Sequence, residues 1–363
     1  MKRSIVLARQ RIGLSFGGAE GYVSLLARAM RERGANVCLM AQEVDDGLVR
    51  DGFPVVRAES RWINIWNAYS FARAVQGYKR DHPETCVVAF DRVPDVDFIR
   101  AGDGCHRAYL SAMGQERMAR VSFKHRVLLR LERQAYTSSR LKYIFSNSKM
   151  VAREIQELYD VPDDKIGVVH TGLPAAAAPL PTKSSARSGL GLASDSRVIL
   201  FAGHNYERKG LDALIRALAQ VKDARWTTLV AGKGDISKYR DLARRLGVEE
   251  CVMFLGPRPL DDLFAAADVF VLPTRYDPLA RVCVEAARAG LPVITTRRNG
   301  FSEWIEGDWG YVMSNETSVP DLAGILRRAF TADLESMGRR LKNRVAGLTI
   351  EKNADEMLKR IEA

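Results

Sequence analysis

The sequence has no long apolar run. No stretch of about 20 apolar residues occurs among its 363 residues, which excludes a helix that spans a membrane. The apolar core of the N-terminal segment, residues 5–8, is short and is closed by Arg9 and Arg11, unlike a secretory signal peptide. We therefore expect a cytoplasmic protein, and peripheral contact with a membrane surface stays open.

Cysteine and metal-ligand patterns are sparse. The five cysteines are odd in number and widely spaced without a CxxC pair, which favours reduced thiols over a disulfide framework or a zinc site. Asp95-Val96-Asp97 is a DxD sequence, but it precedes an apolar run and has no second cluster of oxygen ligands beside it. Cys105 and His106 have no clear partner for nucleophilic catalysis. The sequence thus predicts no metal site and no cofactor.

The GxGxxG and Walker motifs are also missing, so a standard dinucleotide or P-loop site lacks support. SFGGAEG, residues 15–21, nevertheless lies between the first predicted strand and the first predicted helix. Gly17 and Gly18 would let the backbone approach an anion beside the free N–H groups of that helix, whose first turn contains Glu20. A plain tight turn explains the same residues, and both interpretations stay open.

Basic residues are in surplus. The chain has 55 Lys and Arg against 44 Asp and Glu, a net charge of +11, which suggests an anionic partner. Residues 117–142 contain eight basic residues and only Glu132 as an acid. This segment is compatible with a solvated helix face and with a patch that binds a membrane surface or a phosphosugar. Nucleic acid is not expected, because aromatic residues are sparse around these charges.

Apolar runs alternate with helical patterns along the chain, which predicts parallel strands joined by crossover helices. The fold class is therefore α/β, with two doubly wound Rossmann-like domains, because the chain is too long for one typical core. Residues 173–192 are rich in Ala, Pro and Ser and predict a linker. It would join an N-terminal domain over 1–172 to a C-terminal domain over 193–345. A helical segment over 346–363 could pack back on the N-terminal domain.

The loop HNYERKG, residues 204–210, follows Gly203 and the first strand of the second domain. Ligands of doubly wound sheets bind beyond the carboxyl ends of the strands, where this loop lies. Arg208 and Lys209 directly precede a predicted helix over 210–220, so two cations and a positive helix end converge. That combination suits a diphosphate, although a solvated basic loop has the same pattern.

The loop DPLARVCVE, residues 277–285, joins another strand to a helix predicted over 281–289. Residues 278–281 would present backbone N–H groups to an anion at the start of that helix. Glu285 lies about one turn in, where a carboxylate could accept both hydroxyls of a ribose. Asp277 could hold hydroxyls of the group beyond the phosphates or could cap the turn.

These loops occur together and in order, and through them the chain resembles the retaining glycosyltransferases of family 4. That family has the GT-B fold, in which two Rossmann-like domains face a cleft. The resemblance rests on Gly17-Gly18-Ala19-Glu20, Gly203 with Arg208-Lys209-Gly210, LFAAADVFVLPT leading to Asp277 and Glu285, AGLPVITT, and NGFSEWIEGDWGYV over 299–312. Within the family, RAGDG (100–104) and the basic helix after it are most similar to the lipopolysaccharide core glucosyltransferases.

The resemblance implies a role for each matched residue. The catalytic set would be Asp103, near the reacting sugar, with Arg208, Lys209 and Asp277. The donor-binding set would be Gly17, Gly18, Glu20, Gly203, Arg208, Lys209, Asp277, Pro278, Leu279, Ala280, Arg281 and Glu285. The family pattern has a Glu where this chain has Asp277, with the spacing to Glu285 kept.

The resemblance also implies the chemistry. A hexose, glucose by the narrower likeness, would pass from a nucleotide sugar such as a UDP-sugar to a glycan or glycolipid acceptor such as the lipopolysaccharide inner core. Configuration would be retained without a protein nucleophile or a metal, and a departing phosphate oxygen would take the acceptor's proton. Two alternatives stay open: a GT-B nucleotide-sugar epimerase, and a non-catalytic basic protein that binds membranes or nucleic acid.

Overall fold

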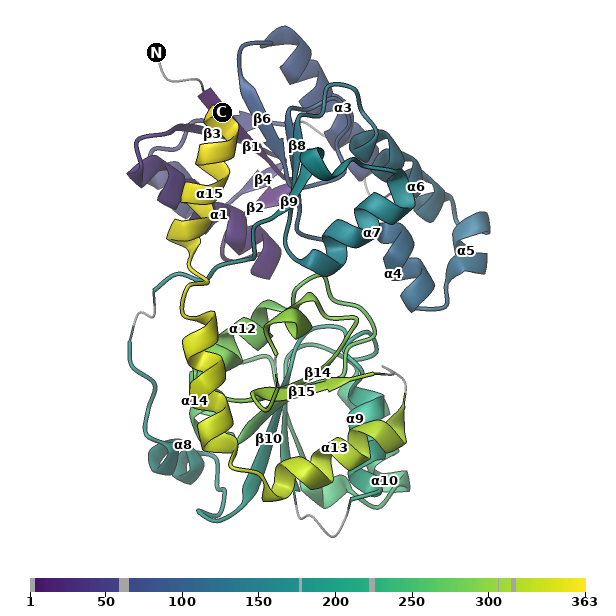
Figure 1. Ribbon diagram of the computed structural model, residues 1–363, viewed down its shortest axis with the longest axis vertical. Coiled ribbons are helices and arrows are strands. Elements are labelled where there is room, and N and C mark those ends of the chain that lie inside the picture. Colours follow the sequence, from purple (N-terminus) through teal and green to yellow (C-terminus); the bar gives the residue numbers. More distant parts are fainter. Residues whose placement is uncertain (1–3, 59–64, 176–177, 222–225, 306, 315–317) are drawn as a thin grey trace. The chain divides into compact units, whose positions relative to one another are not determined.

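The computed structural model describes residues 4–58, 65–175, 178–221, 226–305, 307–314 and 318–363. It divides into two compact units, Met1–Pro174 with Leu348–Ala363, and Ala175–Gly347 (Figure 1). Each unit is built on its own parallel β-sheet, as the alternating sequence pattern predicts.

The sheet of the first unit has the strand order β5-β3-β1-β6-β7-β8-β9, and every pairing is parallel. Its strands are β1 (Ser4–Ala8), β3 (Asn36–Ala41), β5 (Val55–Arg57), β6 (Cys86–Ala89), β7 (Phe98–Ala101), β8 (Tyr143–Ser146) and β9 (Ile166–Val168). The central strands are apolar and buried on both faces, as strands of a helix-covered parallel sheet must be. The chain reverses direction across the sheet between β1 and β6, so the carboxyl ends of these two strands form a topological switch point.

Helices cover this sheet. They are α1 (Gly18–Glu32), α2 (Asp46–Arg50), α3 (Ile65–Asp81), α4 (His106–Ala112), α5 (Glu116–Val121), α6 (Phe123–Tyr136), α7 (Lys149–Tyr159) and α15 (Ile350–Glu362), and a short separate pair is formed by β2 (Arg11–Ile12) and β4 (Glu43–Val44). The sequence pattern over 115–138 predicts one long helix, but the structure has two, α5 and α6. The break is Ser122, whose extended backbone ends α5 and precedes the first residue of α6.

The last helix, α15, belongs to the first unit although it comes from the far end of the chain (Figure 1). It packs on α1 and adds Met357 and Ile361 to the core of that unit. The Asn353 side chain fixes its position, because its Oδ1 accepts hydrogen bonds from Gly172 N at 2.7 Å and from the Tyr22 hydroxyl at 3.0 Å. Its Nδ2 donates to the His170 carbonyl at 2.7 Å. One buried amide thus joins α15 to two other segments.

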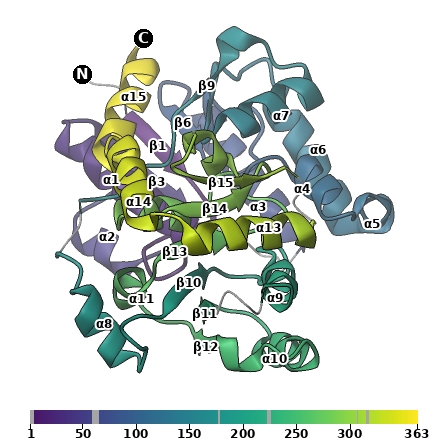
Figure 2. The ribbon, with the colours of Figure 1, turned by 60° about the horizontal axis from the view of Figure 1, so that its bottom comes forward.

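The second unit has a six-stranded parallel sheet in the order β12-β11-β10-β13-β14-β15. Its strands are β10 (Arg197–Ala202), β11 (Trp226–Ala231), β12 (Val252–Gly256), β13 (Val269–Leu272), β14 (Val293–Thr296) and β15 (Gly310–Met313). Its helices are α8 (Lys183–Gly189), α9 (Leu211–Ala219), α10 (Ile236–Arg245), α11 (Asp261–Ala266), α12 (Arg281–Arg288), α13 (Val319–Thr331) and α14 (Leu334–Val345). Helix α13 packs on α9 (Figure 2). Helix α14 packs on α12 (Figure 1). The switch point of this sheet lies between β10 and β13.

Part of the segment expected to be a linker, 173–192, is ordered in the second unit. Helix α8 begins after Thr182, whose hydroxyl caps it by accepting from Ser185 N, and it packs against α11. Arg187 is buried and donates to the Ala266 carbonyl and to Asp268. A seven-residue helix rich in Ser shows little periodicity, so composition alone does not reveal it.

Candidate functional site

The carboxyl ends of β10 and β13 bring a carboxylate against two cations. The Asp277 carboxylate accepts a hydrogen bond from Arg208 Nη1 at 3.1 Å and a second from Lys209 Nζ. Asp277 is 6% exposed and Lys209 7%. Burial by itself would raise the pKa of Asp277, but the charges of Lys209 and Arg208 outweigh it and lower that pKa, so the carboxylate is ionised. The loops 204–210 and 277–285 therefore meet at this edge through an ion-paired cluster.

Backbone contacts set the geometry of this cluster. The Arg208 carbonyl accepts from Thr274 Oγ1 at 3.0 Å and from Arg275 N at 2.8 Å, and Arg208 Nη1 donates to the Tyr276 carbonyl at 2.9 Å. Gly210 has a φ of +78°, and a Cβ there would lie 2.0 Å from the Pro273 carbonyl oxygen. The two loops approach this closely only because residue 210 is glycine.

Gly203 leaves room for the Lys209 side chain. A Cβ on Gly203 would meet the aliphatic carbons of Lys209 at 3.3 Å, so the stem of the lysine lies along the end of β10 while its ammonium reaches Asp277. Packing against Lys209 is therefore one reason for a glycine at position 203. Close approach of a ligand to the backbone would be a second reason.

The loop before α12 offers fewer N–H groups than the expectation for residues 278–281, since Pro278 has no backbone N–H and another donor is used internally. The Ala280 N–H donates to Asn299 Oδ1 at 3.0 Å, and Leu279 and Ala280 are buried. Asn299 is itself fully buried and also accepts from Phe301 N. The Asn299 side chain therefore accepts the hydrogen bond of one N–H that was expected to face an anion. This contact forms because the loop folds onto the turn after β14.

Glu285 lies on α12, where Arg281 Nε donates to its Oε1 at 2.9 Å. Both side chains are about one-third exposed, at 30%. The carboxylate is thus oriented by a neighbour one turn away and remains accessible, which is the geometry needed to accept ligand hydroxyls.

A second cluster occupies the switch point of the first unit, around Arg9. This arginine follows β1, is buried, and donates to the Phe90 carbonyl at 3.3 Å. Its Nη2 lies 3.4 Å from Glu20 Oε1 and 3.5 Å from Asp103 Oδ1. Burial would lower the pKa of Arg9, but Asp103, Asp91 and Glu20 together raise it, so the guanidinium stays charged. Arg9 thus brings together Glu20 and Asp103, two residues that the sequence predicts for the site. Arg9 itself was not among the predicted residues.

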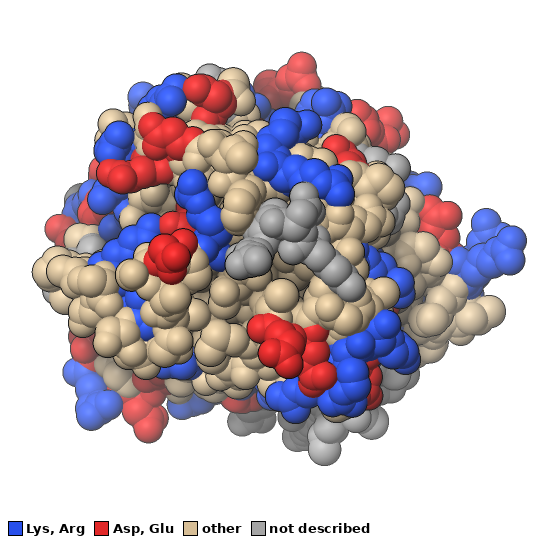
Figure 3. Space-filling view, turned by 90° about the horizontal axis from the view of Figure 1, so that it is seen from below, with Lys and Arg blue, Asp and Glu red and all other residues tan. Residues whose placement is uncertain are grey.

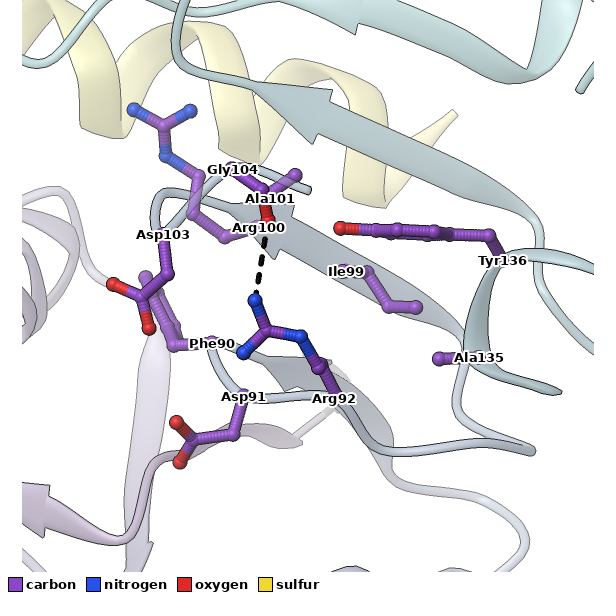
Figure 4. Close-up of a pocket in the computed structure, with 10 residues that line it drawn as sticks. All are labelled: Phe90, Asp91, Arg92, Ile99, Arg100, Ala101, Asp103, Gly104, Ala135 and Tyr136. Carbon is purple, nitrogen blue, oxygen red and sulfur yellow. Dashed lines mark hydrogen bonds between the residues drawn. The ribbon is translucent and has the colours of Figure 1, made fainter. Parts of the chain in front are cut away.

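Asp91, which follows β6, completes this cluster. Its Oδ2 accepts from Gln10 N at 2.6 Å. Burial raises its pKa, Arg9 lowers it, and Asp103 raises it. Figure 4 shows the Asp91 and Asp103 carboxylates on the same side of a pocket that is also lined by Arg92, which donates to the Gly104 carbonyl at 3.4 Å. Arg9 and Asp91 each follow a buried parallel strand, which is the sequence signal that could have identified them.

The remaining predicted residues of the first unit lie at the start of α1. Gly17 is the residue before α1, Gly18 is its first residue, and Glu20 turns from the first helical turn to Arg9. Glu20 is therefore held by an internal ion pair.

Residues considered for other chemistry have structural partners. Asp97 is buried and pairs with Lys79 at 2.8 Å. His106 is buried, its Nε2 lies 3.0 Å from His125 Nδ1, and burial followed by the charge of Arg92 lowers its pKa to about 4. Glu132 is fully buried and accepts from the N–H groups of His106 and Arg107, so this acid anchors the start of α4. Among the described residues, no group of three or more His, Cys, Asp or Glu could hold a metal ion.

Two family models match the chain. The model described as Glycosyltransferase Family 4 matches residues 16–176, and the model described as Glycosyl transferases group 1 matches residues 196–331. The chain is a glycosyltransferase. The second match includes Arg208, Lys209 and Asp277, and the first includes Glu20, Asp91 and Asp103 but begins after Arg9.

Relatives of this glycosyltransferase agree with that assignment. It is 28% identical over 330 residues to the lipopolysaccharide glucosyltransferase WaaG of Escherichia coli (strain K12), covering 87% of each chain. It is 32% identical over 206 residues to the D-inositol 3-phosphate glycosyltransferase of Corynebacterium aurimucosum, covering 52% of this chain and 48% of that protein.

Solved structures give the fold. The crystal structure of WaaG superposes with a TM-score of 0.84 at 22% identity, covering 98% of this chain and 99% of that one. Anabaena Alr3699/HepE, solved with UDP and glucose, superposes with a TM-score of 0.72 at 17% identity over the full length of both chains. The expected GT-B class, with two parallel-sheet α/β domains, is confirmed.

Proposed function

We propose that this glycosyltransferase moves glucose from a UDP-linked donor to a glycolipid or glycan acceptor such as the lipopolysaccharide inner core. Configuration would be retained and no metal ion used. The observation that carries the proposal is the cluster of Arg208 with the buried Lys209 and Asp277 at the switch point of the second unit. The relative WaaG is a lipopolysaccharide glucosyltransferase, and HepE binds UDP and glucose, which supports the choice of donor and acceptor class.

The donor roles follow from the charges. Arg208 and Lys209 together exceed the single charge of Asp277, so the cluster has a net positive charge for a diphosphate. Glu285, oriented by Arg281, would accept the ribose hydroxyls. Asp277 would accept hydroxyls of the donor sugar, and Asp103, oriented by Arg9, would lie near the reacting sugar.

The chemistry needs no protein nucleophile in this proposal. The bond between the anomeric carbon and the diphosphate oxygen breaks as the acceptor oxygen bonds to the same face of that carbon. The acceptor hydroxyl's proton passes to the departing phosphate oxygen. The contribution of Arg208 and Lys209 is to stabilise the negative charge that grows on the leaving group, and the rest of the site aligns the substrates.

A transfer assay tests this function. UDP-sugars are incubated with the protein and purified core lipid, and the mass of the lipid is followed. Replacing Glu285 with Ala is expected to lower kcat/KM for the UDP-sugar by about tenfold to a hundredfold, since charge-assisted hydrogen bonds to the ribose are lost. Glu335→Ala removes the acid of another i,i+4 helical pair, with Arg339, and should change nothing. Unchanged transfer by Glu285→Ala would show that the donor site is assigned wrongly.

The same assay separates the alternatives. Formation of an epimer from the donor without any acceptor would indicate the epimerase, although the relatives named above are transferases. Family membership argues against a non-catalytic protein.

The helix pair α5–α6 supplies a surface that suits an anionic membrane. Apolar side chains are exposed there beside exposed basic ones, and Val121 is 82% exposed, which is unusual for an aliphatic residue. Met118 and Phe123 are exposed as well, next to Arg120 and Lys124. Figure 3 shows Lys and Arg side chains next to uncharged ones at the right edge of the view, over the α5–α6 pair.

No helix in the described part of the chain is long and apolar enough to cross a membrane. We propose that this pair lies on the membrane surface, with the apolar side chains among the lipids and the basic ones at the headgroups.

Vesicle flotation tests this contact. The protein should bind vesicles that contain anionic lipid, bind neutral vesicles poorly, and dissociate as salt rises. Val121→Glu combined with Phe123→Glu should weaken binding at least about tenfold, because apolar area is lost and charge is added. Val49→Glu changes another exposed aliphatic residue of the same unit and should have no effect. Equal binding by all three proteins would contradict the assignment of α5–α6.

A further inference from the structure

Asp277 is the counter-ion of the two cations that the proposed function gives to the diphosphate. Its carboxylate accepts from both Arg208 and Lys209. Lys209 is almost fully buried, and an ammonium in that position needs a negative partner, because burying an unpaired charge costs several kcal/mol. The structure therefore meets this need with an internal carboxylate.

A diphosphate and the Asp277 carboxylate would compete for the same donors. Both are anions, and two like charges about 5 Å apart repel by roughly 3 kcal/mol at an effective dielectric of 20. Lys209 and Arg208 cannot give their best geometry to both. Either the carboxylate leaves the cations when the diphosphate arrives, or it permanently weakens the binding of that ligand.

The backbone of Asp277 is fixed, so only its side chain can move. Asp277 N donates to the Arg298 carbonyl at 2.8 Å, and the Asp277 carbonyl accepts from Gly300 N at 3.0 Å. Rotation about the side-chain bonds would withdraw the carboxylate from Lys209 without disturbing the loop. A Glu at this position, as the family pattern has, would reach one methylene further.

We propose that Asp277 is an internal substitute for the diphosphate. It holds Arg208 and Lys209 in place in the ligand-free enzyme, and the diphosphate displaces it from them. The released carboxylate oxygens then accept hydroxyls of the donor sugar, so binding of the phosphates prepares recognition of the sugar. This inference rests on the proposed function, and it makes Asp277 a positioning residue before the ligand binds and a sugar ligand afterwards.

The second unit contains a matched control. Asp268 also pairs with one lysine, Lys183, and one arginine, Arg187. Its side chain is 8% exposed, the same as that of Asp277. Asp268 accepts from Val198 N at 2.7 Å, near the amino end of β10, so it lies at the edge of the sheet opposite the carboxyl ends of the strands. Removing its charge should affect folding without affecting the binding of a diphosphate.

Calorimetric titration with pyrophosphate and with UDP tests the exchange. Asp277→Asn should bind pyrophosphate about tenfold more tightly than the wild type, because a competing negative charge is gone. Its melting temperature should be lower without ligand and should rise more when pyrophosphate is added. Sugar transfer by this variant should fall despite the tighter binding. Asp268→Asn should melt lower than the wild type and bind pyrophosphate with unchanged affinity.

The outcomes separate the two proposals. If the wild type binds UDP and pyrophosphate but Asp277→Asn binds pyrophosphate equally or more weakly, the exchange is wrong and the proposed function stands. If the wild type binds neither ligand, the proposed function fails and the exchange fails with it. Should the Asn variant not fold, Asp277→Ser provides the same comparison, since its hydroxyl is neutral and can still accept from Lys209.

Discussion

Replacing Lys209 with Ala is expected to lower kcat for sugar transfer by about a hundredfold to a thousandfold, the usual effect of removing one donor to a developing negative charge. The Lys209 ammonium is buried beside Asp277, in a site of low dielectric where its charge acts strongly on a leaving diphosphate. Arg208 alone would then face both the carboxylate and the ligand. Steady-state transfer from UDP-glucose to core lipid measures the loss, and pyrophosphate titration should show weaker binding.

Lys183→Ala is the matched control for this prediction. Lys183 also forms an ion pair with a buried aspartate of the second unit, Asp268, but the lysine itself is exposed and distant from the loops of the site. Its removal should leave kcat unchanged. Equal rates for Lys209→Ala and the wild type would remove Lys209 from the proposed leaving-group site.

Replacing Arg9 with Met is expected to destabilise the first unit by about 3 kcal/mol, since the buried cation that pairs with partly exposed carboxylates is removed. Glu20 and Asp103 would lose their shared partner, and Asp91 would lose the charge that opposes the rise of its pKa. Transfer should fall too, because Asp103 is no longer oriented. Urea unfolding followed by circular dichroism measures the change in stability.

The loss of stability should depend on pH in a defined direction. The pKa of Asp91 is raised in the folded protein, so folding favours its protonated form, and that contribution is lost as pH rises through the folded pKa. Without Arg9 this pKa rises further. The Arg9→Met variant should therefore approach the wild type in acid, near the ordinary pKa of a carboxyl group, and fall further below it as pH increases from there.

Arg11→Met provides the control in the same segment. Arg11 is exposed and forms its ion pair with the exposed Glu43, so the loss of its charge should have little effect at any pH. A pH-independent loss of stability in Arg9→Met would mean that the guanidinium acts by packing and not as the counter-ion of Asp91.

The sequence was sufficient for the fold class because alternating apolar runs and helical patterns allow few arrangements other than parallel sheets. It was also sufficient to place Arg208, Lys209 and Asp277 at one edge of a sheet, because the carboxyl ends of parallel strands share an edge. It did not show that Ser122 separates two helices, or that residues 183–189 form a helix, since short elements leave little periodicity.

Side-chain partners were beyond the reach of the sequence. Arg9 and Asp91 are 82 positions apart in the chain, and they lie near Asp103 because β1, β6 and β7, which these residues follow, are successive strands of the sheet. Asn299 accepts the Ala280 N–H because of a similar neighbourhood of strands. Asn299 follows β14, and β14 lies beside β13 in the sheet.

What the sequence by itself determined is the fold class, the family and the kinds of residue at each strand end, because these depend on local patterns and their order. Only the tertiary structure decided which charges pair. Asp277 could have been read as a free sugar ligand, and the structure makes it the buried counter-ion of Arg208 and Lys209. The physical reason is that an ion pair is set by distances of a few ångströms between residues remote in the chain, and sequence spacing does not contain those distances.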